Sequence, residues 1–353
     1  MGLALSVLAV VLAALFVGLL IIIHEAGHYF AALWGGMRVN RFSIGFGPVL
    51  FRSRRGETDF QVAAIPLGGF VEVAGLQEDD GTDSSDPRSY QNRSFMERFN
   101  MVLAGPAANY AAALLILWAY FGAFNVQFTG PFRVVAVVPD SAAAEGGLKA
   151  NDVIVGSPNG EFADRKAVLQ AIQDSGGDPL RLKILRDGQP EVISVRPRPA
   201  GSGFRLGIQF EETAGVTEPL GFSAGFSRAT QSIWDQSKGL LSVFSRLFTR
   251  PSEVSGSLSG PIGIVQQLAR AIESAPMAAM ATVGALSVAL GLFNLLPIPA
   301  LDGSRLLFLL IGAIRRRPVP AKLENTVHAV GLLLLMGVLL LVSWNDVMRW
   351  LSG

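Results

Sequence analysis

The hydrophobic pattern of the chain is set by four long apolar runs with polar segments between them. The first, Leu3 to Ile23, has 21 residues without a charge, and the run continues past His24 to Leu33. About 20 apolar residues in a helix cross a hydrocarbon core of roughly 30 Å. The other runs lie at 99–124, 277–296 and 326–342. This pattern predicts an α-helical polytopic membrane protein with about four transmembrane helices.

Basic residues concentrate in two of the polar segments and predict the orientation. Eight arginines fall in 35–98, and the run Arg315 to Arg317, with Lys322, follows the third apolar run. Since cytoplasmic loops are enriched in Lys and Arg, both segments are expected on the cytoplasmic side and the N-terminus outside. No Lys or Arg precedes Arg38, so the first run is interpreted as a retained helix and not as a signal peptide.

The Arg-rich segment contains two runs typical of β-strands, Val39 to Pro48 and Phe60 to Val73, both broken by Gly and Pro. Within the second run, Pro66 to Val71 is unusually apolar for a solvated loop. A hairpin that dips into the membrane would explain this, because non-helical backbone at that depth must be buried in protein or line a cavity. An ordinary cytoplasmic hairpin is the alternative.

Between 126 and 200 the chain changes character, which predicts a small extramembrane domain. The expected elements are strands at 132–138, 152–155, 180–185 and 191–195, a helix at 165–173, and a hairpin turn at Asp187-Gly188. Ser141 to Ile154 resembles the helix–turn–strand segment of bacterial PDZ domains, which bind peptides by adding a strand to a sheet edge. A domain that only blocks access sterically is the alternative. The amphipathic segment 222–250 is expected either on the membrane surface or packed on this domain.

Two of the three histidines and a glutamate interrupt the first apolar run, in His24-Glu25-Ala26-Gly27-His28. Residues four apart share a helix face, so His24 and His28 can bind one ion, while Glu25 lies beside it. Two His ligands with an adjacent Glu as general base is a zinc hydrolase pattern, in which zinc lowers the pKa of a coordinated water to about 7. Ionisable residues within a membrane helix are rare and usually functional. Because cysteine is absent, a metal site must use His and carboxylate ligands.

A candidate third ligand, Asp302, follows a break in the third apolar run. Pro297 and Pro299 remove two N–H donors and end the helix there. A lone carboxylate in an apolar setting needs a partner, and zinc takes three protein ligands and leaves one position open. Capping of the next helix is the alternative role for Asp302. The orientation inferred from the basic loops puts Asp302 at the same cytoplasmic end as His24. The third histidine, His328, is expected to be a packing or helix-end residue.

These features together resemble the bacterial site-2 proteases, intramembrane zinc metalloproteases, over nearly the whole chain. The segments that carry the resemblance are the His24–His28 motif, Gly45 to Pro48, Pro66 to Val71, Ala104-Gly105-Pro106 with Asn109, one PDZ-like domain, Gly260 to Ile262, and Asn294 to Gly303. The resemblance implies His24, His28 and Asp302 as Zn²⁺ ligands, Glu25 as catalytic base, and Asn294 as a substrate-binding residue. Ser304 departs from the pattern, because a second Gly is common there.

The expected organisation is a first transmembrane helix with the metal motif (1–34), a cytoplasmic, membrane-dipping β region (35–98), a second transmembrane helix (99–125), a periplasmic PDZ-like domain (126–200), an amphipathic linker (201–276), a broken third transmembrane helix (277–314), a basic loop (315–325), and a fourth transmembrane helix with the C-terminus (326–353). The resemblance implies a bacterial inner-membrane protease with its active site toward the cytoplasm. Its substrates would be single-pass membrane proteins, such as anti-sigma factors already cut by another protease, or remnant signal peptides.

Two other functional classes compete with the protease. A non-catalytic membrane scaffold that presents a PDZ domain would not need Glu25. A metal transporter would also use intramembrane His and Asp, but transporters usually contain internal repeats, and none is found in the sequence. The net charge of +1 gives no indication of a nucleic-acid partner. The lipid bilayer and transmembrane substrates are therefore the expected partners.

Overall fold

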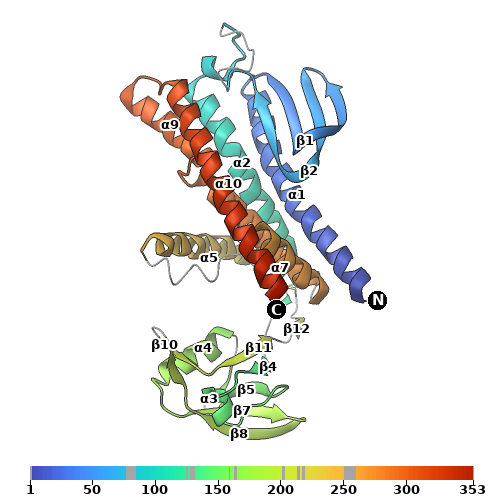
Figure 1. Cartoon of the computed structure of the whole chain (residues 1–353), viewed down its shortest axis with the longest axis vertical. Coiled ribbons are helices and arrows are strands. Elements are labelled where there is room, and N and C mark those ends of the chain that lie inside the picture. The colour runs from blue at the N-terminus through green and yellow to red at the C-terminus, as the bar shows by residue number, and fades with distance from the viewer. Residues whose placement is uncertain are drawn as a thin grey trace. The chain divides into compact units, whose positions relative to one another are not determined.

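The computed structural model describes residues 2–352 except 77–84, 125, 128–131, 159, 163–164, 201–202, 213–214, 217–218, 250–259 and 275. The chain divides into two compact units (Figure 1). The first unit comprises Met1–Ala123 and Leu220–Gly353, and the second is Phe124–Pro219. The second unit is therefore an insertion between two helical parts of the first.

Helices make up most of the first unit. They are α1 (Gly2–Trp34), α2 (Phe95–Ala119, continued by the π-helical turn Tyr120–Phe124), α5 (Gly221–Thr249), α7 (Pro261–Ser274), α8 (Pro276–Leu295), α9 (Asp302–Arg315) and α10 (Ala321–Ser352); a short 3₁₀ turn, Tyr90–Asn92, precedes α2. A capping box begins α2: the Ser94 hydroxyl accepts from the Glu97 N–H, and the Glu97 carboxylate accepts from the Ser94 N–H.

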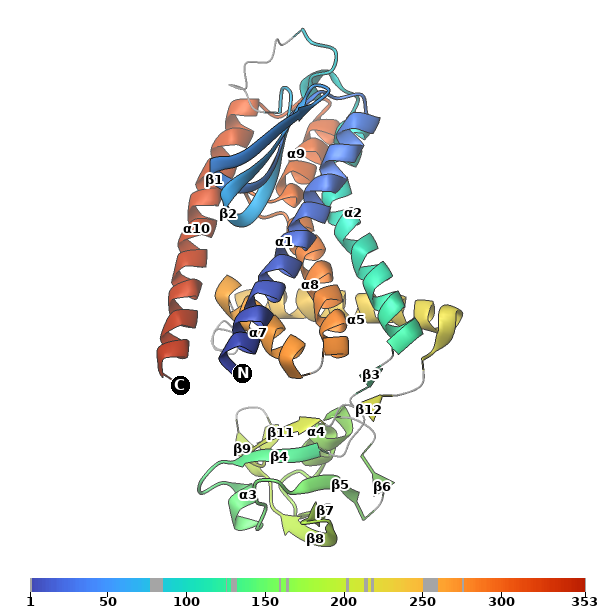
Figure 2. The same cartoon turned by 90° about the vertical axis from the view of Figure 1, so that its right-hand side faces the viewer.

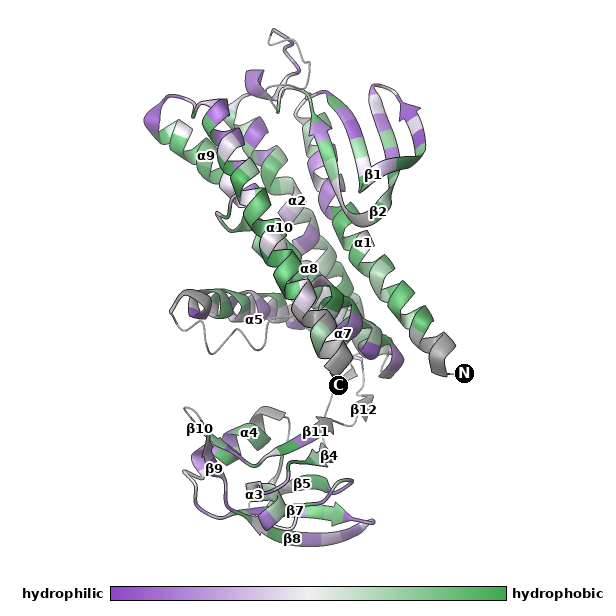
Figure 3. Cartoon of the chain, in the orientation of Figure 1, coloured by the Kyte–Doolittle hydropathy of each residue, from purple (hydrophilic) through white to green (hydrophobic). Residues whose placement is uncertain are grey.

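Three of these helices are long and apolar enough to cross a membrane, within the residues that the structure describes: Val7–Trp34, Phe95–Phe124 and Lys322–Trp344. In Figure 3 the ribbons of α1 and α10 are coloured mostly as hydrophobic residues. The expected third span corresponds to α8, Pro276–Leu295, which has 20 residues and contains the apolar helical stretch Ala279–Leu295. The chain is thus a helical protein with three candidate membrane helices plus β structure.

The helices pack through small apolar residues. Ala9, Ala13 and Leu20 of α1 are buried in one cluster with Leu268 of α7 and Ala279 of α8. Small side chains allow close helix approach in the way that membrane helices favour. This packing leaves the C-terminal half of α1 between α2 and the β region, as Figures 1 and 2 both show.

Two long bent strands, β1 (Val39–Arg55) and β2 (Thr58–Val73), form a sheet beside α1. The chain reverses near Gly45 and Gly47, both with positive φ, so Val39–Ile44 has partners on two sides. One partner is Asp59–Val62, and the other is Gly69–Val73. Within the described residues, Gly69–Val73 has no strand on its other edge. The expected strands are confirmed, and the structure shows them longer and more bent than the sequence pattern indicated.

The second unit is built around one antiparallel sheet of order β11-β4-β5-β7-β8, with β6 paired to β5. Its elements are β3 (Val126–Gln127), β4 (Phe132–Val137), α3 (Ala142–Glu145), β5 (Val153–Ser157), β6 (Gly160–Glu161), α4 (Arg165–Asp174), β7 (Leu180–Arg186), β8 (Gln189–Val195), β9 (Arg198–Ala200), β10 (Gly203–Arg205), β11 (Ile208–Glu212) and β12 (Gly215–Val216). The four expected strands, the helix and the Asp187-Gly188 turn are all present. Strand β11 lies beyond residue 200, so the sheet extends past the range assigned from the sequence.

A buried aspartate joins three segments of the second unit. Both oxygens of Asp152 accept hydrogen bonds from Arg186, at 2.9 and 2.7 Å, and one also accepts from the Lys149 N–H at 2.7 Å. Arg186 in turn donates to the Gly147 carbonyl. Burial opposes ionisation, but the Arg186 guanidinium and the Lys149 N–H together hold the pKa of Asp152 below its ordinary value. Every charge in this cluster has a protein partner.

Candidate metal centre

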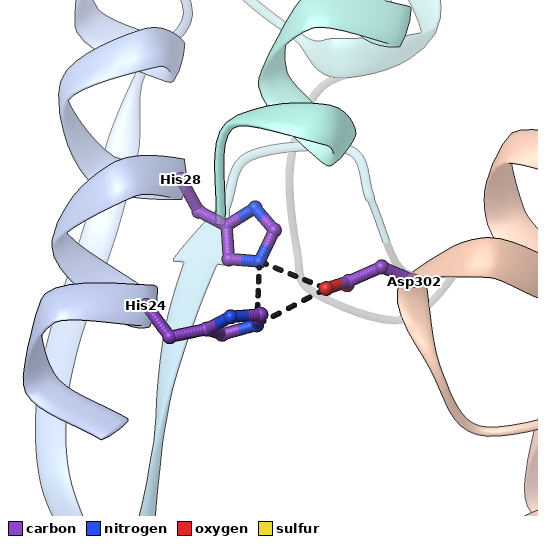
Figure 4. A group of neighbouring side chains, drawn as sticks. All are labelled: His24, His28 and Asp302. Atoms are coloured by element: carbon purple, nitrogen blue, oxygen red, sulfur yellow. Dashed lines mark hydrogen bonds and ion pairs between the residues drawn. The ribbon is translucent and has the colours of Figure 1, made fainter. Parts of the chain in front are cut away.

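His24, His28 and Asp302 converge at one point (Figure 4). The two histidines lie one turn apart on α1, and Asp302 is the first residue of α9, directly after the proline-containing turn. The two Nε2 atoms are 3.2 Å apart, and Asp302 Oδ2 lies 3.1 Å from His24 Nε2 and 3.3 Å from His28 Nε2. The structure thus brings together the three residues that the sequence analysis selected, across 274 positions of chain between His28 and Asp302.

The proton of His28 is assigned by its backbone neighbour. His28 Nδ1 lies 2.9 Å from the Met101 carbonyl of α2. A carbonyl only accepts, so Nδ1 must carry the proton and donate. The neutral ring then presents the bare lone pair of Nε2 toward His24 and Asp302. Such a hydrogen bond to the ring nitrogen that does not ligate is typical of metal-binding histidines.

Asn109 of α2 plays the corresponding part for His24. Its side-chain amide lies 3.2 Å from His24 Nδ1, and the residue is fully buried. In the orientation drawn, Nδ2 faces His24, while Oδ1 is buried without a hydrogen-bond partner. Amide orientations are assigned from the network, and a half-turn places Oδ1 against Nδ1 as an acceptor. His24 Nδ1 then donates, and its Nε2 also presents a bare lone pair.

The donor set fits a zinc ion. Two imidazole nitrogens and a carboxylate oxygen, all facing one another with lone pairs, repel unless a cation lies among them, and Asp302 Oδ2 has no hydrogen-bond partner of its own. Tetrahedral zinc ligands about 2.1 Å from the ion are about 3.4 Å from one another. The observed separations of 3.1 to 3.3 Å match that spacing. Three protein ligands leave a fourth position open, as in catalytic zinc sites.

A cavity of about 590 Å³ opens onto this group. Its lining includes Glu25 and Asn294, so all five residues selected from the sequence border one space. The strand Gly69–Val73, which is paired on one edge only within the described residues, forms another part of the wall. Asn294 donates a hydrogen bond to the Leu290 carbonyl one turn earlier in α8, which holds its side chain at this wall. The cavity therefore combines a candidate metal site, a carboxylate and a strand.

His328 lies outside the metal group, as expected. Its Nδ1 accepts a hydrogen bond from the Ala300 N–H at 3.2 Å, within the turn that precedes Asp302. Two other contacts of the centre were not predicted. Asn109 was named only among the segments that carry the family resemblance, and the Met101 carbonyl is a backbone group with no sequence signal. The contact of Asn109 could have been suspected from the sequence, because an Asn within a membrane helix needs a polar partner.

The fold and the site define a membrane-embedded protein with a metallopeptidase-like centre. Residues 12–338 match the sequence model of the family described as peptidase family M50. A protein of Nostoc sp. named "putative zinc metalloprotease" is 33% identical over 342 residues, covering 93% of both chains. A Clostridium perfringens protein with the same designation is 32% identical over 339 residues, covering 96% of this chain and 98% of its own. The zinc metalloprotease RasP of Geobacillus kaustophilus is 26% identical over 412 residues, covering 94% and 96%.

The chain therefore belongs to peptidase family M50, the site-2 protease family. It is a zinc metalloprotease of the site-2 protease type.

Proposed function

We propose that the protein hydrolyses peptide bonds in or near the transmembrane segments of single-pass membrane proteins. His24, His28 and Asp302 would hold Zn²⁺, Glu25 would act as general base, and Asn294 would hold substrate. The observation that supports this assignment most strongly is that both histidine Nε2 atoms and the Asp302 Oδ2 atom converge within 3.3 Å of one another. They border a cavity that is also lined by Glu25. A scaffold has no use for that arrangement.

Each residue has a distinct task in this proposal. When bound, zinc supplies Lewis acidity that polarises a carbonyl and acidifies water. Glu25 follows His24 directly on α1 and lines the same cavity, so it can accept the proton of the attacking water and donate it to the leaving amine. Met101 and Asn109 keep the imidazoles in the tautomer that leaves Nε2 free.

The strand Gly69–Val73 offers a way to present substrate. A transmembrane helix hides its carbonyls in internal hydrogen bonds, and exposing one backbone group in lipid costs several kcal/mol. An unpaired strand edge can accept an extended peptide and replace those bonds. Because Gly69–Val73 is unpaired on one edge and lines the cavity, a substrate strand added there would pass close to Glu25. This gives the expected membrane-dipping region its function.

The same proposal includes the membrane arrangement. The arginines of 35–98 and the basic residues Arg315 to Arg317 favour the cytoplasm for the metal end of the first unit. The second unit, with its PDZ-like order of elements, would then face the periplasm or exterior and select or restrict substrates. Anti-sigma factors shortened by another protease, and remnant signal peptides, are the substrate classes that the family resemblance implies.

Metal analysis and cleavage of a model transmembrane substrate test the assignment together. We expect about one zinc per chain in the wild type and in Glu25→Gln, and none in Asp302→Ala. Glu25→Gln should lower the cleavage rate at least about a hundredfold, the usual contribution of a general base. A Glu25→Gln protein that still cleaves would favour the scaffold, and full zinc in Asp302→Ala would remove that residue from the site.

Proline substitutions test the strand edge separately. N–H groups of neighbouring strand residues point to opposite edges, so Phe70→Pro and Val71→Pro form a matched pair. One removes a donor from the free edge, and the other breaks pairing with Val39–Ile44. The free-edge variant should cut a helical substrate more slowly and retain its zinc, while Phe70→Ala and Val71→Ala control for the side chains. Unchanged cleavage by both proline variants would contradict strand addition.

A further inference from the structure

The turn that carries Asp302 makes two local backbone hydrogen bonds, from the Ile298 N–H to the Leu296 carbonyl at 2.7 Å and from the Leu301 N–H to the Ile298 carbonyl at 3.1 Å. Pro297 and Pro299 lack N–H groups, so they cannot donate. Ala300 adopts a positive φ of 74°, a left-handed conformation that is unfavourable for a non-glycine residue. Such a conformation persists only where the surroundings hold it in place. The Ala300 N–H has its partner outside the turn, so contacts from outside contribute to the conformation that places Asp302.

One such contact comes from His328 of α10. The Ala300 N–H donates to His328 Nδ1 at 3.2 Å, which requires that nitrogen to be unprotonated. His328 Nε2 must then carry the proton of the neutral ring, and it lies 3.5 Å from the hydroxyl oxygen of Ser304. The Ser304 hydroxyl donates to the Leu301 carbonyl at 2.7 Å. Each donor in this series of hydrogen bonds meets an acceptor. The series connects Ala300, which precedes Asp302, with Ser304, which follows it.

A second contact lies one helical turn further along α10. A Cβ added to Gly331 would collide with the ring and backbone of Pro299. Gly331 thus lets α10 lie directly against the turn, three positions after His328 on the same helix face. Many of the described apolar side chains of α10, such as Leu333 and Leu340, are exposed. Besides its contact with α7, α10 therefore touches the protein closely at this turn.

We propose that His328 is a positioning residue for the metal centre, which acts with Gly331 to fix the Pro297–Leu301 turn and so the carboxylate of Asp302. His328 does not touch the three candidate ligands. It holds Ala300 in its left-handed conformation and supports Ser304, and these two residues flank Asp302 by two positions on either side. This inference rests on the proposed role of Asp302 as a zinc ligand. It also gives Ser304, the departure from the family pattern, a hydrogen-bonding function.

Zinc affinity, measured on the full-length protein by competition with a chelator, tests the inference. His328→Leu should weaken zinc binding roughly tenfold, the lower end of the effect seen when indirect supports of a metal site are removed. His328→Asn places an amide oxygen where Nδ1 lies and should restore most of the affinity. Gly331→Ala should also weaken binding, since Pro299 must move. Thr326→Val is the matched control: this hydroxyl bonds only the Lys322 carbonyl of its own helix.

The thermal stability of the metal-free proteins separates positioning from a purely structural role. If His328 only stabilises the fold, His328→Leu will lower the melting temperature without zinc and leave zinc affinity at the wild-type value, which would overturn the inference. Asp302→Ala shows how much zinc affinity is lost when the proposed ligand itself is removed. Wild-type affinity in Asp302→Ala would refute the proposed ligand, whereas lost affinity there with unchanged affinity in His328→Leu and Gly331→Ala would refute only the role of His328.

Discussion

Asp302 and Asp152 are both aspartates that the fold takes largely out of water, yet their surroundings differ in one decisive way. The side chain of Asp152 is 2% exposed, and Arg186 and the Lys149 N–H satisfy both of its oxygens. The side chain of Asp302 is 19% exposed, and its Oδ2 faces two imidazole nitrogens without a hydrogen bond. One carboxylate has a complete set of protein partners, whereas the other presents an oxygen without a hydrogen-bond partner.

The difference separates a structural charge from a functional one. A buried ion pair with every hydrogen bond made holds segments together, and losing one partner leaves the other charge unpaired. A buried group left unsatisfied is costly, so its retention indicates a ligand or a catalytic task. Asp152 links the loop before β5 to β7 through its hydrogen bonds. Asp302 Oδ2 makes no hydrogen bond, which fits its proposed role as a metal ligand. Four substitutions or conditions test this contrast.

Asp302→Asn should have the largest effect, and on function alone. The amide is a poor zinc ligand, so the variant should lose its zinc and at least about a thousandfold in cleavage rate, because both water activation and carbonyl polarisation depend on the metal. The metal-free variant should melt at about the same temperature as metal-free wild type, since Asp302 Oδ2 makes no hydrogen bond that would hold the fold. Zinc analysis, a cleavage assay and thermal melts check this. A lower melting temperature would mean that Asp302 is structural, like Asp152.

Asn109→Leu should weaken zinc binding about 10- to 100-fold, the usual cost of removing the partner that orients a ligating histidine. The apolar side chain is similar in size but cannot accept from His24 Nδ1. Asn109→Asp keeps an acceptor and should bind zinc nearly normally. Ser287→Ala, which removes only a hydrogen bond to the Asn109 backbone carbonyl, is the matched control. Equal affinities in all three variants would show that Asn109 merely packs the helices.

The sequence predicted the three candidate metal ligands better than the residues that hydrogen-bond to them or to the turn before Asp302. The His24–His28 spacing could be interpreted from the sequence because two ligands four residues apart must lie on one helix face. The prolines before Asp302 could be interpreted because they must end a helix. Asn109 gives only a weaker signal, an amide within a membrane helix, and the role of His328 depends on which helices become neighbours. The length of β1 and β2 was also underestimated, because the Gly and Pro residues taken as breaks bend the strands without ending them. The apolar run at 277–296 was located well, because the helix found there, α8, runs from Pro276 to Leu295.

Asp152→Asn should affect the fold and spare the chemistry. Loss of the charge pair should lower the free energy of unfolding of the second unit by about 2–3 kcal/mol, since Arg186 keeps Glu191 as a partner. Hydrogen exchange of the β5 and β7 amides in the full-length protein measures this change. Zinc content should stay at one per chain. Asp187→Asn, the same substitution in the exposed β7–β8 turn, should leave exchange unchanged, and an equal loss there would contradict a specific role for Asp152.

The smallest and most specific effect concerns pH. The folded-state pKa of Asp152 lies below its ordinary value, while an unfolded Asp titrates near about 3.9. The stability that this carboxylate contributes is therefore complete above about pH 5 and is lost as pH falls toward the folded-state pKa. Asn does not titrate, so the difference in exchange protection between wild type and Asp152→Asn should shrink steadily below pH 5. A difference that stays constant down to pH 3 would show that the carboxylate acts through packing and not through its charge, and Asp152 would then no longer be the paired counterpart of Asp302.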